Sequence, residues 1–275
     1  MYLIQGIVLL LLSLSVQSRS IREFGNVTSE EIVNSNACRY DSMSVSAIIE
    51  RANENVGKLN GDFTIMHGDI MVYTGLQNAD PCTSRGCKWP RSRDGNVYVP
   101  YVISNEYSSS ERSVIQSGLD SFKKSTCIRF IPRTNQEQYI DIISGSGCFS
   151  SVGQRPEKQI LSLKKNSCIY YHTVQHELLH ALGFKHEQSR SDRDKHVKIL
   201  FQNVKPEKVR NFKIEDTNNL NTPYDYNSVM HYSRCAFSSD NKPTIIPIPD
   251  NNVSIGGAAE MSPNDILRVN RLYCT

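Results

Sequence analysis

Short segments between residues 96 and 164 alternate apolar and polar residues. The first is NVYVPYVIS at 96–104, where Val97, Val99 and Val102 supply the alternation. Further β-rich runs follow at 127–132 (CIRFIP), 139–144 (YIDIIS) and 159–164 (QILSLK). A period of two places alternate side chains on one face of a sheet, so these runs predict a cluster of strands.

Two segments have the longer period of an α-helix. The first spans 108–125, and Ser108 with Glu111 three residues later forms a capping box. Its apolar face comprises Val114, Ile115, Leu119 and Phe122. The second helix is capped by Ser262, with Pro263 in the first turn and Asp265 completing the box. We expect its inward-facing residues to be Ile266, Leu267, Val269 and Leu272.

The part of the chain beyond residue 200 is rich in turn signals, as at 221–227 (NTPYDYN) and 246–252 (IPIPDNN). The order is therefore strands, a central helix around residue 176, an irregular part and a final helix. This order predicts an α+β domain in two lobes.

The amino-terminal residues predict a secretory signal at 1–18. An apolar run from Ile7 to Val16 is too short to span a bilayer, and small residues end at Ser18. No stop-transfer stretch follows, so we expect a secreted protein, with secretory granules as a candidate store and no membrane contact after signal removal. Residues 19 to about 60 lack a sustained apolar period and predict a loosely packed segment. Asn26 and Asn252 are candidate N-glycosylation sites.

Composition narrows the functional classes. A formal charge of +3 over 275 residues, with scattered Lys and Arg, argues against nucleic acid as a partner. Eight cysteines in a secreted chain predict mostly disulfides, although the sequence alone leaves their pairing open.

The segment HELLHALGFKHE at 176–187 holds three of the seven histidines in the chain. His176 and His180 are four residues apart, so a helix places them on one face, where they can share an ion. A continuous helix would carry His186 roughly 9 Å further along its axis, whereas zinc–nitrogen bonds are about 2.1 Å long. Gly183 can end the helix in a left-handed conformation and let the chain turn His186 back to the same ion.

Three imidazoles would leave one position on a zinc ion open, as catalytic rather than structural sites do. Water bound there would lose several pKa units and could attack at neutral pH. Glu177, next to the first histidine, is placed to take the proton of that water and hand it to the leaving amine. A solvated helix with scattered histidines is the alternative, but the added glycine and third histidine favour a single catalytic zinc ion.

The segment 176–187 resembles the signature of a known family. HExxHxxGxxH is similar to the zinc signature of the metzincins, and HExxHxxGFxHE to that of the astacin metallopeptidases. SVMHY at 228–232 resembles the methionine turn of that family. The resemblance implies that Met230 forms a hydrophobic floor under the zinc, and that Tyr232 is a fifth ligand able to swing off and stabilise the oxyanion.

The resemblance covers residues 78–275 and implies a two-lobed metzincin fold. A mixed twisted sheet and long helices would form the amino-terminal lobe, and a mostly irregular carboxyl-terminal lobe would end in a helix. It also implies the disulfides Cys127–Cys274 and Cys148–Cys168. The close pair Cys82 and Cys87, expected as a third disulfide, is similar to the six-cysteine fish branch that includes the hatching enzymes and nephrosin. Cys235 is then the odd cysteine, which we interpret as a buried free thiol rather than a cross-link to a partner.

Members of that family are inhibited by a propeptide aspartate that binds the zinc and lies in the motif FxGD. MHGD at 66–69 supplies Asp69, with Met66 in place of the phenylalanine. The resemblance thus implies a propeptide at 19–77 that inhibits the peptidase domain at 78–275 until a cut near residues 77 and 78. Glu187 is similar to the family glutamate that meets the new amino terminus.

The predicted activity is that of a zinc endopeptidase acting on extracellular proteins, with egg envelope as one candidate substrate. We expect a monomer whose substrate lies extended along an edge strand, for which SGCFSSVG at 146–153 is a candidate. The run IGGAA at 255–259 lacks the basic residue that gives some family members a preference for acidic side chains. Two alternatives remain: a zinc-binding module without catalysis, against which Glu177 argues, and a disulfide-stapled interaction domain.

Overall fold

The computed structural model describes residues 38, 41–56, 63–73 and 87–275. The predicted signal at 1–18, Asn26, Cys82 and the predicted cut at 77 and 78 lie outside these residues. The strands are β1 Phe63–Met66, β2 Ile70–Tyr73, β3 Val97–Ile103, β4 Ile128–Pro132, β5 Ile140–Ile143, β6 Cys148–Ser150, β7 Gln159–Leu163, β8 Val197–Ile199 and β9 Ile245–Pro247. The α-helices are α2 Val45–Ala52, α4 Ser109–Phe122, α5 Tyr171–Ala181 and α6 Pro263–Val269. Shorter helical turns are η1 Asp41–Met43, η2 Glu187–Ser189, η3 Arg193–Lys195, η4 Phe201–Asn203, η5 Pro206–Phe212 and η6 Asn270–Cys274.

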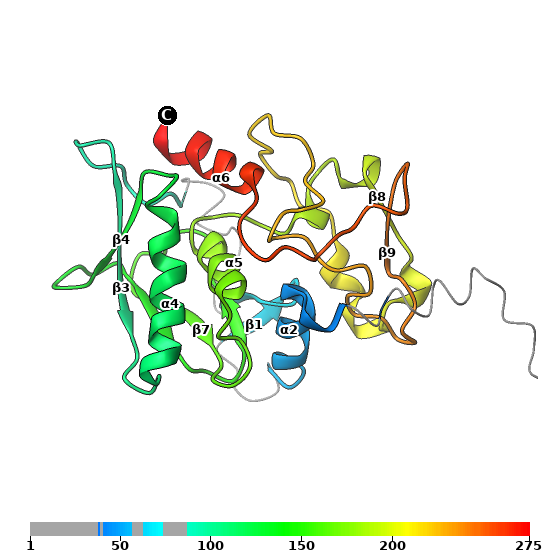
Figure 1. Ribbon diagram of the computed structural model, residues 1–275, viewed down its shortest axis with the longest axis horizontal. Helices are drawn as coiled ribbons and strands as arrows, with labels where there is room; N and C mark the ends of the chain where they lie inside the picture. Colours follow the sequence, from blue (N-terminus) through cyan, green and yellow to red (C-terminus); the bar gives the residue numbers. More distant parts are fainter. Residues whose placement is uncertain (1–37, 39–40, 57–62, 74–86) are drawn as a thin grey trace, which may run out of the picture.

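A seven-stranded mixed sheet has the order β1-β2-β6-β7-β5-β3-β4. The pairs β3 with β4, β3 with β5 and β5 with β7 are parallel, whereas β6 runs antiparallel to β7. The strands predicted at 96–104, 127–132, 139–144 and 159–164 are therefore present. Figure 1 shows α4 and α5 side by side against this sheet, with the irregular lobe beyond α5.

Helices α4 and α5 pack closely because α4 carries a glycine at their contact. A β-carbon on Gly118 would lie 2.4 Å from Cγ1 of Val174, so any larger residue would push the helices apart. The capping box of α4 is present: the side chain of Ser108 accepts from the N–H of Glu111, and the Glu111 carboxylate accepts from the N–H of Ser108. The close contact at Gly118 therefore fixes α5 against α4.

The final helix α6 begins with the predicted capping box of Ser262 and Asp265. Its inward face differs from the prediction, because Leu267 is exposed while Asp265 and Arg268 are buried together with Val269. These two charged side chains turn inward to bond to residues of the second lobe, and this orientation directs Leu267 to solvent. The prediction that Leu267 faces the core is wrong.

The segment preceding residue 60 is also more ordered than its composition suggested. Helix α2 buries Val45, Ile48, Ile49 and Ala52, which follow the i, i+3, i+4, i+7 spacing of a helical face. The side chain of Ser44 caps it by accepting from the N–H of Ala47. The expectation of a loosely packed segment is wrong for residues 41–56, where the helical period is short but complete.

The second lobe has a small core of its own between η2 and α6. Its two-stranded sheet pairs β8 with β9 in antiparallel register. The buried apolar residues around it include Val197, Phe212, Tyr232, Phe237 and Ile245. The α+β fold in two lobes is thus confirmed. Within the described parts of the chain, no helix is both long and apolar enough to cross a membrane.

Disulfides join distant parts of the chain. Cys127 bonds to Cys274 and Cys148 to Cys168, the pairs that the family resemblance implies. Cys235 bonds to Cys38, with 5.5 Å between their Cα atoms, so its interpretation as a free thiol is wrong. That interpretation counted only cysteines after residue 78, whereas the partner lies in the predicted propeptide. Cys82 is not among the described residues, so its pairing with Cys87 stays a prediction.

Candidate metal centre and active site

Helix α5 ends at Ala181, one residue after the second histidine of the HELLHALGFKHE segment. Gly183 has a φ of +100°, its N–H donates to the carbonyl of His180 at 2.8 Å, and the N–H of Phe184 donates to the carbonyl of Leu179 at 3.0 Å. This pair of bonds is a Schellman motif, in which glycine is favoured because it has no β-carbon. The chain therefore reverses at Gly183 and brings His186 back toward α5.

Three imidazoles and one carboxylate converge in the resulting space. The ring centroids of His176, His180 and His186 lie 4.7–5.3 Å apart. Asp69 is buried among them, with Oδ2 at 3.0 Å from Nε2 of His176, and Oδ1 at 3.4 Å from Nε2 of His180 and 3.2 Å from Nε2 of His186. One ligand atom from each of the four residues lies within 4.8 Å of the other three.

Neighbouring backbone carbonyls hold two of these rings in a metal-binding tautomer. Nδ1 of His176 lies 2.9 Å from the carbonyl oxygen of Val229, and Nδ1 of His180 lies 2.7 Å from that of Phe184. A carbonyl oxygen can only accept, so each Nδ1 carries the proton and each Nε2 keeps its lone pair. Within the described part of the chain, Nε2 of His180 has no hydrogen-bond partner although it is buried. These observations fit a metal ion at the point where the Nε2 atoms converge.

Burial lowers the pKa of His186 to about 3 and also lowers the pKa of His180. Burial alone would raise the pKa of Asp69, but its electrostatic interactions with His186 and His180 and its hydrogen bonds with His176 and His180 hold that pKa well below its usual value. Neutral imidazoles with an ionised carboxylate are the donor set that zinc binds.

The carboxyl group of Glu177 lies fully buried, and neither of its oxygens has a hydrogen-bond partner among the described residues. Burial raises the pKa of Glu177 well above its ordinary value, and the negative charge of Asp69 adds to the shift. A buried carboxyl group without a partner is costly. Its placement next to the converging histidines indicates a role in the chemistry of this site rather than in stability.

The segment 228–232 supports the histidines from the second lobe. Met230 is buried, and its carbonyl accepts from the N–H of Glu187 at 3.0 Å. The Tyr232 ring centroid lies 4.7 Å from that of His186, and the phenol donates a hydrogen bond to the carbonyl of His67. Asp265 on α6 accepts from the Ser228 hydroxyl at 2.7 Å, so the final helix braces this segment.

Glu187 is held by groups that the sequence motifs did not reveal. Its carboxylate accepts from Arg268 at 2.6 and 2.8 Å, from Arg190 at 3.2 Å and from the N–H of Asp225 at 2.7 Å. Arg268 lies 81 residues away on α6, so no local pattern could have pointed to it. The backbone N–H of Glu187 also donates to the carbonyl of Met230. Together these bonds fix the chain directly after His186.

The predicted substrate strand lies beside Asp69. In β6, within the candidate segment 146–153, the N–H of Ser150 donates to the carbonyl of Asp69 at 3.0 Å. Strand β2 pairs with β6 in parallel at Ile70 and Ser150, and β1 and β2 form a hairpin that ends the sheet on this side. The segment 63–73 therefore occupies the position next to β6 where an extended peptide would pair.

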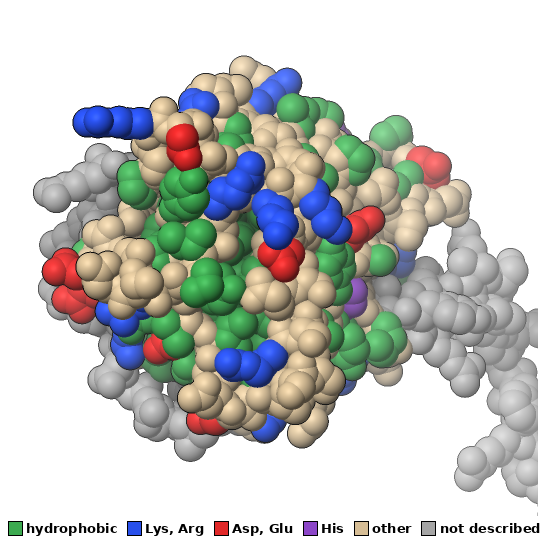
Figure 2. Space-filling view, turned by 60° about the vertical axis from the view of Figure 1, so that its left-hand side comes forward, with side chains coloured by type: hydrophobic (Ala, Val, Ile, Leu, Met, Phe, Trp, Pro, Cys, Tyr) green, Lys and Arg blue, Asp and Glu red, His purple; other side chains and the backbone are tan. Residues whose placement is uncertain are grey.

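Three of the other histidines make contacts outside the cluster, and the surface charges are mixed in sign. The ring of His172 contacts the hydroxyl of Thr173 at 3.1 Å, that of His196 stacks on Tyr224, and that of His231 contacts the Tyr224 hydroxyl at 2.8 Å. Figure 2 shows Lys and Arg on one face interspersed with acidic, apolar and neutral side chains. That face does not carry the basic stripe expected of a nucleic-acid partner.

Comparison with known proteins supplies a family for this arrangement. A family sequence model described as Astacin, a peptidase family, matches residues 85–274. The Low choriolytic enzyme of Oryzias latipes is 43% identical over 270 residues, which cover 97% of this chain and 96% of that protein. The High choriolytic enzyme 2 of the same fish is 47% identical over 215 residues, which cover 78% and 77% of the two chains.

Solved structures agree with the sequence comparison. High choriolytic enzyme 1 (HCE-1), described as a hatching enzyme zinc-protease from Oryzias latipes (Medaka fish), superposes with a TM-score of 0.68 at 49% identity. The match covers 71% of this chain and 98% of that chain. Myroilysin, at 20% identity and a TM-score of 0.52, shares the fold alone.

Proposed function

This chain belongs to the astacin family of zinc metalloendopeptidases, and we propose that His176, His180 and His186 hold its single catalytic zinc ion. The observation that carries the proposal is the convergence of these buried imidazoles with Asp69 within 4.8 Å. A zinc ion bound there would supply a Lewis acid that activates water and polarises the substrate carbonyl.

The chain's own residues then move the protons. Glu177 accepts the proton of the attacking water and delivers it to the leaving amine, a role supported by its buried carboxyl group without a hydrogen-bond partner. Tyr232 donates its phenolic hydrogen bond to the oxygen of the cleaved carbonyl once the propeptide has left, in place of its present bond to His67. Met230 packs beneath the histidines as an apolar support.

The described form is the inhibited precursor in this proposal. Residues 1–18 are the signal, 19–77 the propeptide and 78–275 the peptidase domain. Asp69 occupies the site among the histidines, and the hairpin 63–73 covers β6, so neither the attacking water nor the substrate has access. The propeptide is thus the chain's own inhibitor. After a cut near residues 77 and 78, Glu187 would meet the new amino terminus in addition to Arg268.

The substrate is an extracellular protein, and the similarity to choriolytic enzymes favours egg-envelope protein. Secretion through the predicted signal brings the enzyme to it. We propose that the enzyme acts as a monomer, because the cluster of histidines and Glu177 is completed by residues of a single chain.

The test is peptide cleavage by the activated enzyme with and without a chelator. We expect activity to fall by at least about a thousandfold when the metal is removed, and to return on adding zinc. Metal analysis should give a single zinc ion per chain. Zinc bound without cleavage of any peptide would instead favour the non-catalytic binding module, and incubation with isolated egg-envelope protein tests the substrate separately.

A further inference from the structure

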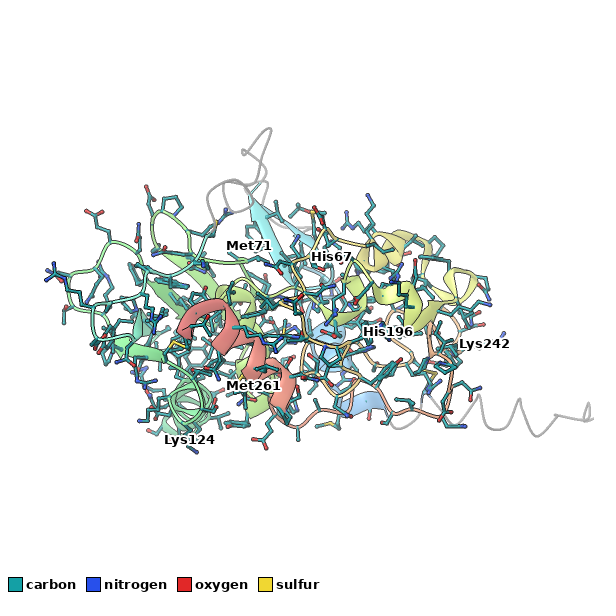
Figure 3. All side chains as sticks on the ribbon, turned by 90° about the horizontal axis from the view of Figure 1, so that it is seen from above. His67, Met71, Lys124, His196, Lys242 and Met261 are labelled. Atoms are coloured by element: carbon teal, nitrogen blue, oxygen red, sulfur yellow. A yellow bond between two sulfur atoms is a disulfide. The ribbon has the colours of Figure 1, made fainter. Side chains whose placement is uncertain are left out.

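The turn between β1 and β2 places the side chain of His67 against two charged residues of the second lobe, Glu215 and Lys185. His67 is only 4% exposed, and its Nε2 lies 2.7 Å from Oε1 of Glu215. The other oxygen of Glu215 lies 2.6 Å from Nζ of Lys185. Figure 3 shows His67 between the strands β1 and β2 and the second lobe. Glu215 therefore has one carboxylate oxygen on the side chain of His67 and the other on Lys185.

The turn that carries His67 is bonded to groups assigned above to the substrate. His67 precedes Asp69 by two residues, and the backbone carbonyls of both residues accept hydrogen bonds from these groups. The carbonyl of His67 accepts from the phenol of Tyr232, and the carbonyl of Asp69 accepts from the N–H of Ser150 on β6. When the propeptide leaves, a substrate bound along β6 will direct a side chain into the place that His67 vacates.

We propose that Glu215 is a specificity-determining residue that favours a basic substrate side chain, lysine or arginine, close to the cleaved bond. The proposal rests on the proposed peptidase function. A basic side chain would pair with Oε1 of Glu215, whereas an acidic one would bring like charges together in a partly buried site. The absence of a basic residue in the run 255–259 agrees with this preference.

Peptide pairs that differ only in lysine or glutamate at each position flanking the cleaved bond test the preference. We expect the activated enzyme to cleave one lysine peptide about tenfold better in kcat/KM than its glutamate partner, as a partly exposed charge pair allows. Glu215→Gln should bring the ratio close to unity, and Lys185→Met should increase it. Asp240→Asn, an exposed acid paired with Lys242, is the matched control and should leave the ratio unchanged.

Peptide binding tests the same preference for a basic side chain without any cleavage. In the Glu177→Gln background, calorimetry can compare the propeptide peptide 63–73 carrying His67→Lys or His67→Glu. Tighter binding of the lysine peptide that disappears in Glu215→Gln supports the proposal. Equal affinities of the two peptides, or a lysine preference that survives Glu215→Gln, would overturn it, whether or not any peptide is cleaved.

A second observation, the Cys38–Cys235 disulfide, carries a separate inference about activation. It joins the predicted propeptide to the second lobe across 197 residues of sequence. Non-covalent contacts flank the bond: the Ser46 hydroxyl accepts from the N–H of Ser233 at 2.9 Å, and Glu50 accepts from Lys205 at 2.9 Å. Hydrolysis of a peptide bond between residues 73 and 87 breaks none of these links.

We infer that a single activating cut leaves residues 38–73 covalently attached to the enzyme. A tethered inhibitor acts at an effective concentration on the order of millimolar, so the hairpin would keep returning to the site. Release then needs a second cut within the propeptide, or a dithiol. The dithiol would donate two electrons, become a disulfide and leave Cys38 and Cys235 as thiols. The covalent attachment holds whatever the enzyme cleaves; only its inhibitory effect rests on the proposed function.

The full-length precursor tests this inference if a recognition sequence for a site-specific protease replaces residues 74–80. After cleavage we expect one band on a non-reducing gel and two bands on a reducing gel. The double variant Cys38→Ser with Cys235→Ser should give two bands in both. Cut wild type should also be about tenfold less active than the cut double variant until a mild dithiol is added. Two bands for wild type without reduction would overturn the covalent attachment, and equal activities before reduction would overturn its inhibitory effect.

Discussion

Replacing Glu177 by glutamine should lower kcat/KM for peptide cleavage by about a thousandfold or more while the enzyme still binds zinc. The amide has the size of the carboxyl group but cannot accept a proton from water. Both oxygens of Glu177 lack a hydrogen-bond partner, so the substitution breaks no existing bond. The loss would therefore reflect proton transfer and not folding.

Three measurements separate the catalytic effect from a structural one. Zinc content and thermal unfolding temperature should match those of wild type, and Asp240→Asn should keep full activity as an exposed acidic control. If Glu177→Gln retained more than about a tenth of wild-type activity, general base catalysis by this residue would be refuted.

The second large effect is expected in the precursor. Asp69→Ala should allow the uncut precursor to cleave peptides, because the carboxylate that lies 3.0–3.4 Å from the three Nε2 atoms is removed. The hairpin still pairs with β6 and competes with the substrate there, so we expect activity at least about tenfold below that of the cut enzyme. Cleavage of a fluorogenic peptide, with gels to show that the precursor remains intact, provides the measurement.

Wild-type precursor, measured in parallel, should show no cleavage. Asp69→Asn keeps the size of the side chain and removes its charge, so it should be activated less than Asp69→Ala but more than wild type. If the Asp69→Ala precursor binds zinc and is folded but is as inactive as wild type, inhibition by Asp69 would be refuted.

Local signals in the sequence predicted much of the fold and of the site. The Gly183 helix end, both capping boxes and the individual strands each depend on residues a few positions apart. The clustering of His176 with His180 follows from a single helical turn. Each of these signals acts through the backbone geometry of one turn or one strand, so the sequence was sufficient for them.

Contacts between distant residues could not be predicted in this way. Arg268 holds Glu187 only because α6 packs against the second lobe, and the same packing turns Leu267 outward. Cys38 finds Cys235 only because α2 docks on that lobe. In each case the deciding partner lies more than 80 residues away, and short-range periodicity carries no information about it.

The Cys38–Cys235 bond has a further consequence for producing the protein. A chain that starts at residue 78 contains seven cysteines and so must leave one thiol unmatched during oxidative refolding. That thiol can attack correct bonds and scramble them. The amino-terminal segment supplies the missing sulfur, so it would serve as a folding aid as well as an inhibitor, and preparations that omit it would give lower yields of native material.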